Sequence, residues 1–148
     1  MLQWKFKYLI DFKISELYNV LQLRSEVFIV EQNCIYQDID GKDNIALHVL
    51  GYKDEVLMAY ARCFKPGDYF KEASIGRVII REQYRKYGYG HDLIKKSINA
   101  IKQEFKETKI RISAQTHLKK LYSSHGFIQE GEGYLEDGIP HINMLMTN

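Results

Sequence analysis

The alternation of apolar and polar positions divides the middle of the chain into a strand, a turn and a helix. Residues 74–80 form a short run rich in β-branched side chains, which is typical of a buried strand. After a run punctuated by glycine at residues 85–90, apolar side chains recur at the spacing of one helical face, at Leu93, Ile94, Ile98 and Ile101. We therefore expect a strand, a glycine-containing turn and a helix in direct succession.

The same patterns predict further elements on both sides of this unit. Strands are expected at residues 3–9, 46–52, 56–64 and 109–114, with two more between residues 127 and 146. Helices are expected from Glu16, with Ser15 as the N-cap, and over the residues before Gly126. A strand, a crossover helix and a strand in this order indicate a parallel pair. The chain length of 148 residues predicts one α/β domain spanning 1–148.

The glycine-containing turn, Arg85-Lys86-Tyr87-Gly88-Tyr89-Gly90, has the chemistry of a phosphate cradle. Glycine lets the backbone approach a ligand closely, and the first amides of a helix lack internal partners and carry partial positive charge. The chain has no G-x-x-x-x-G-K-[ST] run, and Leu93 occupies the third position of a G-x-G-x-x-G fingerprint. The pattern is R-x-x-G-x-G, so neither the P-loop nor the dinucleotide fingerprint accounts for it.

Charge and cysteine content narrow the expected partners. The net charge of +2 makes no strong electrostatic case for nucleic acid. Cys34 and Cys63 are far apart and form no C-x-x-C, so we expect neither a disulfide scaffold nor a zinc site, and a reducing compartment fits. The N-terminal residues lack the apolar run of a signal peptide, and no segment approaches the ~20 apolar residues of a membrane span. We expect a cytoplasmic protein with no nucleic-acid, membrane or metal partner.

Two charged residues interrupt the apolar face of the first helical region. Arg24 and Glu31 fall in the middle of that face on a helical wheel. A buried cation and carboxylate are costly unless they are paired or used. Two interpretations are open: a structural salt bridge, or a face that borders the substrate cleft and binds the acceptor. The following loop carries Asp38, Asp40 and Asp43, either as a solvated loop or as an acidic lip that attracts a cationic acceptor.

Two motifs in this order resemble those of the GNAT superfamily of N-acetyltransferases. The R-x-x-G-x-G turn resembles the superfamily's acetyl-coenzyme A (acetyl-CoA) pyrophosphate loop, and residues 121–127 resemble its helix ending in L-Y-x-x-x-G-F. Nearly the whole chain looks like the ElaA family of GNAT proteins, through the runs 23–34, 36–41, 76–79 and 137–142. The resemblance implies the GNAT fold, a central mixed, largely antiparallel sheet of six to seven strands flanked by about four helices.

The resemblance also implies a role for each matching residue. Backbone groups of Val78, Ile79 and Ile80 would bind the pantetheine arm and the thioester carbonyl, and Arg85, Lys86, Tyr87, Gly88, Tyr89 and Gly90 would bind the pyrophosphate. Gln115 stands where many members have an Asn that contacts CoA, and Tyr122 where a tyrosine often protonates the departing thiolate. Glu82 replaces a proline that is frequent in the superfamily. The implied reaction moves an acetyl group from acetyl-CoA, a co-substrate, directly to an amine without a metal.

A general base would assist this reaction, because a lysine-like amine has a pKa near ~10.4 and attacks only when deprotonated. Glu31, His48 and His141 are the candidates. Histidine titrates near neutrality and suits the role, although each candidate also has an ordinary structural explanation. Tyr122 likewise has one, since an aromatic residue at helical spacing often belongs to the core.

Other functions compete with this interpretation. A non-catalytic CoA-binding sensor or interaction module would keep the glycine loop and could dispense with Tyr122. An enzyme of the acyl-homoserine-lactone synthase type, whose fold is related, would share the Arg24-x-x-x-Phe28-x-x-Glu31 run but would not need a pyrophosphate loop. The expected acceptor is a primary amine of a small molecule or peptide. Its identity, the acyl-chain preference and the formation of a homodimer are left open.

Overall fold

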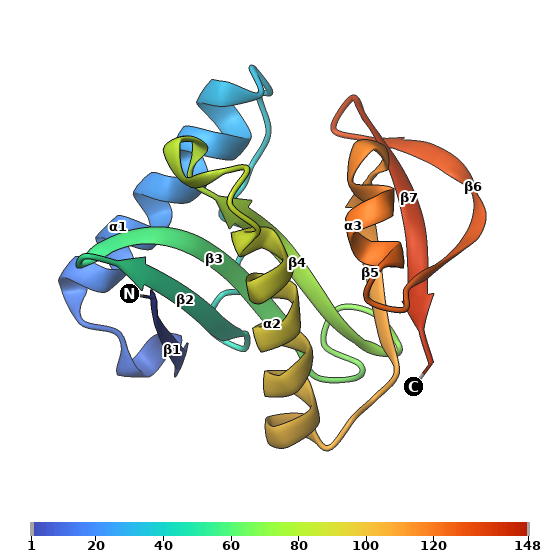
Figure 1. Cartoon of the computed structure of the whole chain (residues 1–148), viewed down its shortest axis with the longest axis horizontal. Helices are drawn as coiled ribbons and strands as arrows, with labels where there is room; N and C mark the ends of the chain where they lie inside the picture. The colour runs from blue at the N-terminus through green and yellow to red at the C-terminus, as the bar shows by residue number, and fades with distance from the viewer. Residues whose placement is uncertain (1, 148) are drawn as a thin grey trace.

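The computed structural model describes residues 2–147, which contain a seven-stranded sheet with helices on both faces (Figure 1). The strands are β1 (Leu2–Tyr8), β2 (Leu47–Lys53), β3 (Val56–Phe64), β4 (Ala73–Ile80), β5 (Ile110–Gln115), β6 (Ile128–Glu136) and β7 (Ile139–Met146). Their order in the sheet is β1-β2-β3-β4-β5-β7-β6. Each neighbouring pair is antiparallel except β4 and β5, which are parallel. The prediction of a mixed, largely antiparallel sheet with one parallel pair is confirmed.

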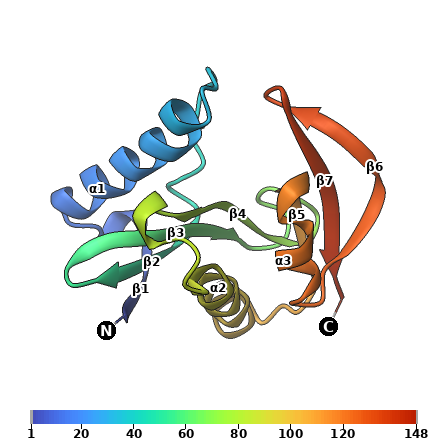
Figure 2. The same ribbon diagram turned by 45° about the horizontal axis from the view of Figure 1, so that its top comes forward.

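The helices lie in two layers (Figure 2). Helix α1 (Ile14–Arg24) covers one face and continues without a break into a π-helical segment, η2 (Ser25–Glu31). Helix α2 (Tyr89–Phe105) covers the other face, and the short α3 (Lys119–Ser123) lies beside β5. The described chain thus has fewer α-helices than the four or so expected. Residues 25–31 extend α1 and do not form a separate helix. Short 3₁₀ turns η1, η3 and η4 occupy Leu9–Asp11, Glu82–Tyr84 and Thr116–Leu118.

The start of α1 differs from the prediction. The helix begins at Ile14, and Lys13 rather than Ser15 is the N-cap. Glu16 Oε1 accepts a hydrogen bond from the Lys13 backbone amide at 2.8 Å, and the same carboxylate pairs with the Lys7 ammonium at 2.8 Å. A carboxylate in the first turn satisfies a free amide, so this side chain supplies the cap that a serine hydroxyl was expected to give.

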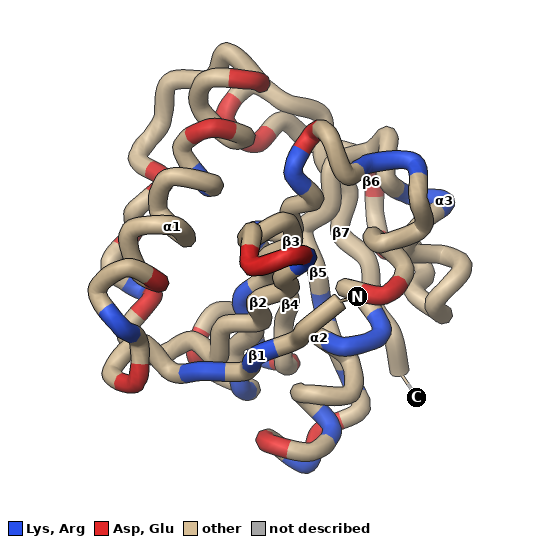
Figure 3. The backbone as a smooth tube through the Cα atoms, turned by 60° about the vertical axis from the view of Figure 1, so that its left-hand side comes forward, with Lys and Arg blue, Asp and Glu red and all other residues tan. Residues whose placement is uncertain are grey.

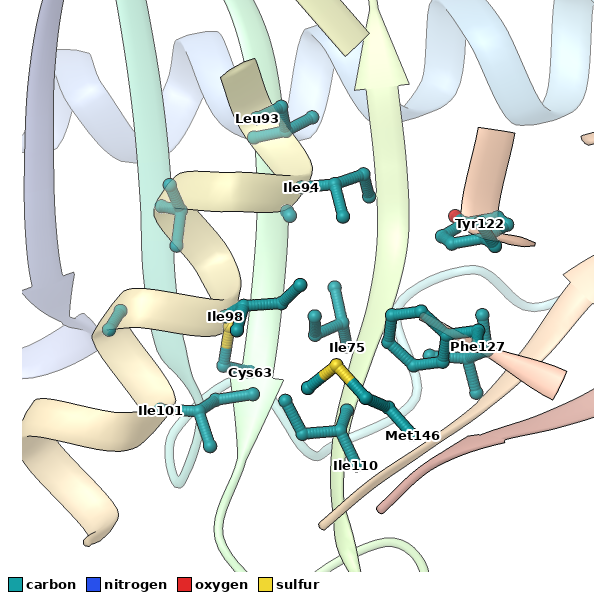
Figure 4. Close-up of a cluster of buried hydrophobic side chains, with 14 of the residues drawn as sticks. Cys63, Ile75, Leu93, Ile94, Ile98, Ile101, Ile110, Tyr122, Phe127 and Met146 are labelled. Atoms are coloured by element: carbon teal, nitrogen blue, oxygen red, sulfur yellow. The ribbon is translucent and has the colours of Figure 1, made fainter. Parts of the chain in front are cut away.

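The two faces of the sheet carry separate hydrophobic cores, because successive side chains of a strand point to opposite faces. On one face, the predicted apolar stripe of α2 packs onto Cys63 and Ile75 (Figure 4). On the other face, Val20 and Leu23 of α1 pack with Tyr60. All four apolar positions predicted for α2, Leu93, Ile94, Ile98 and Ile101, are buried.

Strands β4 and β5 pair only near their first residues and then diverge, as both ribbon views show (Figures 1 and 2). The ladder consists of Ala73 with Ile110 and Ser74 with Arg111. Further along β4, the register with β3 shifts between Tyr60 and Arg62, and Arg77 has a φ of +51°. A bulge of this kind bends the strand and increases its twist. It therefore turns the second half of β4 away from β5.

Charged positions of both signs are interspersed along the backbone (Figure 3). Within residues 2–147, no helix is long and apolar enough to cross a bilayer. Over the same range, no group of three or more His, Cys, Asp or Glu side chains is placed to hold a metal ion. Cys34 and Cys63 are both buried free thiols.

Candidate active site

A cavity of about 450 Å³ lies between the diverging parts of β4 and β5. Its walls come from η2, β4, the turn before α2, the end of β5, α3 and the β6–β7 hairpin. Ile75 and Ala114 belong to the core on the α2 face, whereas Phe28 and Ile79 belong to the core on the α1 face. The cavity therefore reaches both faces of the sheet, which suits a reaction between two different molecules.

The glycine turn forms the α2 side of the cavity. Gly88 is the residue before α2 and has a φ of +82°, which glycine adopts without steric cost. Apart from Gly88 itself and its two chain neighbours, no described residue has a heavy atom within 4 Å of the point that a Cβ on Gly88 would occupy. Tyr89 and Gly90 begin the helix, so their amides have no partner within it. This open cradle of amides, with Lys86 beside it on the cavity wall, fits a pyrophosphate group.

The free edge of β4 forms a second part of the wall. Ile79 and Ile80 pair with β3 on one side, but beyond Ser74 the opposite edge of β4 has no strand beside it. Backbone groups on an unpaired edge are free to bond an extended ligand. Val78, Ile79 and Ile80 all line the cavity, so this edge fits a pantetheine arm, whose amides can donate and accept hydrogen bonds as a peptide does.

Tyr122 lies on the cavity wall opposite this edge. Its side chain is 4% exposed, and its ring packs edge-on against Phe127 with centroids 5.8 Å apart (Figure 4). Burial raises the pKa of its hydroxyl, which keeps the proton on the oxygen at neutral pH. Tyr122 therefore brings a protonated hydroxyl, which can donate a hydrogen bond, to the cavity wall. Gln115, at the end of β5, lines the same cavity.

Arg85 links the glycine turn to two other elements. Its Nε donates to the Ile80 carbonyl oxygen at 2.8 Å, which fixes it to the end of β4. Its two terminal nitrogens donate to the two carboxylate oxygens of Glu31, at 2.6 and 3.1 Å. Arg85 thus joins the turn before α2 to the last residue of η2, across one mouth of the cavity.

His141, on β7, lies on the cavity wall that faces away from α2. Its Nδ1 is 2.7 Å from the Ile139 carbonyl oxygen, which can only accept, so Nδ1 carries the hydrogen and Nε2 has a free lone pair. Nε2 lies 3.5 Å from Glu136 Oε2, and the other oxygen of that carboxylate accepts from the Ser113 hydroxyl at 3.0 Å. His141 therefore has the geometry of a general base.

Residues 14–148 match the family model described as an acetyltransferase (GNAT) domain. The chain belongs to the GNAT acetyltransferase family. It is 43% identical over 146 residues to protein ElaA of Escherichia coli strain K12, a match that covers 97% of this chain and 95% of ElaA. The crystal structure of E. coli ElaA superposes with a TM-score of 0.92 at 42% identity, covering 99% of both chains.

Two further solved structures extend the comparison. An acyl-CoA N-acyltransferase from Pseudomonas aeruginosa is 40% identical with a TM-score of 0.93, over 99% of this chain and all of its own, 100%. A GNAT family acetyltransferase from Elizabethkingia anophelis with acetyl-CoA bound shares the fold alone, at 16% identity and a TM-score of 0.71, over 99% of this chain and 98% of its own. The resemblance to ElaA and the GNAT fold expected from the sequence are confirmed.

Most of the residues predicted for the site of this GNAT protein do line the cavity: Glu31, Val78, Ile79, Ile80, Arg85, Lys86, Gly88, Tyr89, Gly90, Gln115, Tyr122 and His141. Tyr87 does not line it, because its side chain turns outward and is 70% exposed. A contact of Tyr87 with the pyrophosphate therefore stays a prediction, and the orientation of its side chain does not favour it. Its ring instead lies beside that of Tyr89, with centroids 6.0 Å apart.

Arg24 neither pairs with Glu31 nor faces the cavity. Its side chain is fully buried, and its guanidinium bonds Asp38 Oδ2 at 3.0 Å, the Asp38 carbonyl oxygen at 3.0 Å and Asp43 Oδ1 at 2.7 Å. Glu31 bonds Arg85 instead. Both earlier interpretations of Arg24, as the partner of Glu31 and as an acceptor-binding residue, are therefore wrong. Its role is to hold the loop after η2 against the sheet.

The aspartates of that loop do not form a free acidic lip. Arg62 of β3 pairs with Asp40 at 2.5 Å and with Asp43 at 2.9 Å, and Arg77 lies 2.7 Å from Asp38. Burial acts to raise the pKa of Asp40, but hydrogen bonds and the charge of Arg62 outweigh it and hold that pKa well below its usual range. Each aspartate is thus neutralised by an arginine, which excludes the lip as an attractor of cations.

His48 lies outside the cavity, in contrast to its prediction as a candidate base. It is 1% exposed, with Nδ1 2.6 Å from the Tyr60 hydroxyl and Nε2 2.9 Å from the Asp43 carbonyl oxygen. Burial lowers the pKa of His48, so it remains neutral at physiological pH. With both ring nitrogens occupied, His48 is a structural residue that joins β2 to the loop after η2.

Sequence reasoning missed several residues that line the cavity, among them Arg62, Arg77, Ser113 and Glu136. Arg77 stands next to Gly76, a combination that often marks a bulge in a strand and was the available signal. The others gave no signal, because they meet the cavity only through pairing between strands distant in sequence.

Replacing Arg24 by Met is expected to destabilise the fold by about 3–5 kcal/mol, because it leaves three clustered aspartates with two arginines and so one buried negative charge uncompensated. The free energy of unfolding from denaturant titration measures the change. Arg81→Met is the matched control: its partner Glu26 has a side chain 44% exposed, so that loss should stay within about 1 kcal/mol. Equal stabilities of the two variants would contradict the structural role given to Arg24.

Proposed function

We propose that this protein transfers an acetyl group from acetyl-CoA to a primary amine. The observation that carries the proposal is one continuous cavity, which connects the amide cradle at the start of α2 with His141 of β7 and has Tyr122 on its wall. Membership of the GNAT family supports acyl transfer from a CoA thioester. The acetyl group, the amine and the roles of individual residues are the proposed parts.

The amine is the nucleophile, and His141 prepares it. Nε2 of His141 accepts a proton from the incoming ammonium, and the carboxylate of Glu136 at 3.5 Å stabilises the resulting imidazolium. The neutral amine then attacks the thioester carbon directly, so no covalent enzyme intermediate forms. Holding both substrates in one cavity supplies much of the acceleration, because a reaction between two molecules becomes effectively unimolecular.

Other residues of the cavity stabilise the oxyanion and protonate the leaving group. Backbone amides at the free edge of β4, in the segment Val78–Ile80, stabilise the negative charge that develops on the carbonyl oxygen. As the carbon–sulfur bond breaks, the Tyr122 hydroxyl gives its proton to the thiolate, and the second proton lost by the attacking nitrogen restores that hydroxyl by way of solvent. The nitrogen thus gains one bond to carbon and loses two protons, of which one is balanced by the new CoA thiol and the other leaves through His141.

The charge at the end of the cavity near His141 favours an amine as acceptor. The two arginines that line the cavity there, Arg62 and Arg77, are each bound to aspartates. Glu136, with a side chain 45% exposed, and Asp137 on the β6–β7 hairpin line the cavity as further carboxylates. This field attracts the ammonium group of a small molecule or a peptide.

The test is acetyl-CoA turnover, followed as release of free thiol, against polyamines, amino acids, aminoglycosides and lysine peptides. We expect at least one class to accelerate thiol release well above the rate without acceptor. Tight CoA binding without any acceleration would instead support a non-catalytic CoA-binding module. Turnover only with acyl groups on a carrier protein would support an enzyme of the acyl-homoserine-lactone synthase type.

Gly88→Val is expected to abolish stabilisation by CoA. In the wild type, a ligand at about 100 times its Kd adds about 2.7 kcal/mol of stability and raises Tm. A branched side chain at residue 88 would occupy the open space in which a phosphate oxygen fits. Thermal unfolding with and without CoA measures the shift.

Gly131→Val is the matched control for this variant. Gly131 also has a positive φ, +75°, and open space around its Cβ position, but it lies on β6 and does not line the cavity. Both variants should lose stability through backbone strain, whereas only Gly88→Val should lose the shift. If CoA raised the Tm of Gly88→Val as much as that of the wild type, the turn would not be part of the CoA-binding site.

A further inference from the structure

Two ion pairs connect η2 with the segment between β4 and α2. Arg81 Nη1 donates to both carboxylate oxygens of Glu26 at 3.0 Å, and its Nε donates to the Leu57 carbonyl oxygen at 3.0 Å. Arg85 bonds both oxygens of Glu31, and its Nε bonds the Ile80 carbonyl oxygen. Each arginine is thus fixed at three points, by one backbone carbonyl and one carboxylate of the same helical segment.

The two pairs differ in their relation to the cavity. Arg85 is the first residue of the glycine turn, and both Arg85 and Glu31 line the cavity. Arg81 lies before the turn, and neither Arg81 nor Glu26 is on the cavity wall. A change at Glu31 therefore acts on the turn that cradles phosphate, whereas the same change at Glu26 acts on the helical segment alone.

From this contrast we propose that Glu31 is a positioning residue, which sets the pyrophosphate turn through Arg85. The inference rests on the proposed function, since it assigns the turn to CoA. Glu31 holds the guanidinium against the last residue of β4, so the amides of the turn and the free edge of β4 keep one relative placement. A turn that is already placed loses less freedom when the ligand binds.

This role replaces the two that the sequence suggested for Glu31. Both of its oxygens accept from Arg85, at 2.6 and 3.1 Å, so the carboxylate is bound to the turn before α2 rather than presented to an amine. The same bonds neutralise its charge, so Glu31 offers little attraction to a cationic acceptor. Its influence passes through the co-substrate side of the cavity.

Loss of the Glu31 negative charge and loss of its positioning role have opposite effects on the affinity for CoA. The direction of the change in affinity therefore distinguishes the two. Removing a carboxylate near a polyanionic ligand should tighten binding by electrostatics. Loss of the placement held by Glu31 should weaken binding, by about two- to fivefold for a pair that is this exposed, with side chains 36% and 29% accessible. A weaker affinity in Glu31→Gln therefore reports geometry rather than charge.

The experiment measures the Kd of CoA by calorimetry and steady-state kinetics for wild type, Glu31→Gln and Glu26→Gln. We expect Glu31→Gln to raise the Kd of CoA and the KM of acetyl-CoA, with kcat and the KM of the acceptor unchanged. Glu26→Gln should leave all four unchanged. In an Arg85→Lys background, which lacks the guanidinium fork, Glu31→Gln should add no further effect, because the two residues act as a unit.

Each other result has a defined meaning. Tighter or unchanged CoA binding in Glu31→Gln would overturn the inference. A raised KM for the acceptor would indicate that Glu31 binds the acceptor, and a lower kcat would indicate that it acts as the base. Equal effects of Glu26→Gln and Glu31→Gln would show general anchoring of η2. Absence of CoA binding by the wild type would instead defeat the proposed function itself.

Discussion

Tyr122→Phe is expected to lower kcat by about 10²–10⁴-fold while CoA binding stays close to that of the wild type. The change removes one hydroxyl from a ring that is 4% exposed and packed against Phe127, so the shape of the wall is preserved. Only the proton for the departing thiolate is lost. Turnover at saturating acetyl-CoA, together with calorimetric binding of CoA, separates the two quantities.

Tyr60→Phe is the matched control. Tyr60 is also a buried tyrosine, but its hydroxyl bonds His48 at 2.6 Å and it does not line the cavity. That variant should lose stability and keep its kcat. If Tyr122→Phe turned over acetyl-CoA at the wild-type rate, the residue would be an aromatic member of the core and nothing more.

His141→Asn is the second change with a large expected effect. The asparagine amide reproduces the bond that Nδ1 makes to the Ile139 carbonyl but has no group that accepts a proton at the position of Nε2. We expect kcat/KM for the acceptor to fall by about 10²–10⁴-fold at neutral pH. The loss should shrink as the pH approaches ~10, because a lysine-like amine then deprotonates without help.

A pH–rate profile measures this effect, with His48→Asn as its control. His48 is buried away from the cavity, so its replacement should reduce stability but leave the profile of the folded protein unchanged. Parallel profiles for His141→Asn and the wild type, with the same deficit at every pH, would mean that His141 positions the acceptor and does not accept its proton.

The elements that carry a local signal could be predicted from the sequence. The strand before the glycine turn and the stripe of α2 follow from side-chain spacing, and the turn itself from glycine at residues 88 and 90. These features depend on neighbours within a few residues. For the same reason, the cavity residues around the turn before α2 were predicted better than those at the other end of the cavity.

The true partners of Arg24 and Glu31 could not be predicted from a helical wheel, because the helix changes its pitch between these two residues. A wheel of 100° per residue places residues seven apart on one face. Residues 25–31 are π-helical, with amides bonding five residues back, as from Gln32 to Val27 and from Cys34 to Ile29. The wider turn rotates Glu31 away from Arg24 and toward Arg85.

The partners of the buried polar residues were hidden for a different reason. Arg24, His48 and Arg62 meet around Asp43, yet they come from α1, β2 and β3. Nothing in a single sequence shows which charges neutralise one another once distant segments pack. A buried histidine with two occupied nitrogens therefore has the same local sequence signal as a catalytic one.

The short parallel ladder between β4 and β5 has a consequence for how the native state fluctuates. Among the described residues, only two pairs of the β4–β5 ladder join strands β1–β4 to strands β5–β7 within the sheet. Apolar side chains pack one face of this junction. Such a seam is a natural boundary between cooperative units that open separately. A co-substrate bound as proposed would bond the free edge of β4 and touch α3, and so would cross-link the two parts of the sheet. We therefore expect the unliganded protein to open more readily at this junction than the liganded one.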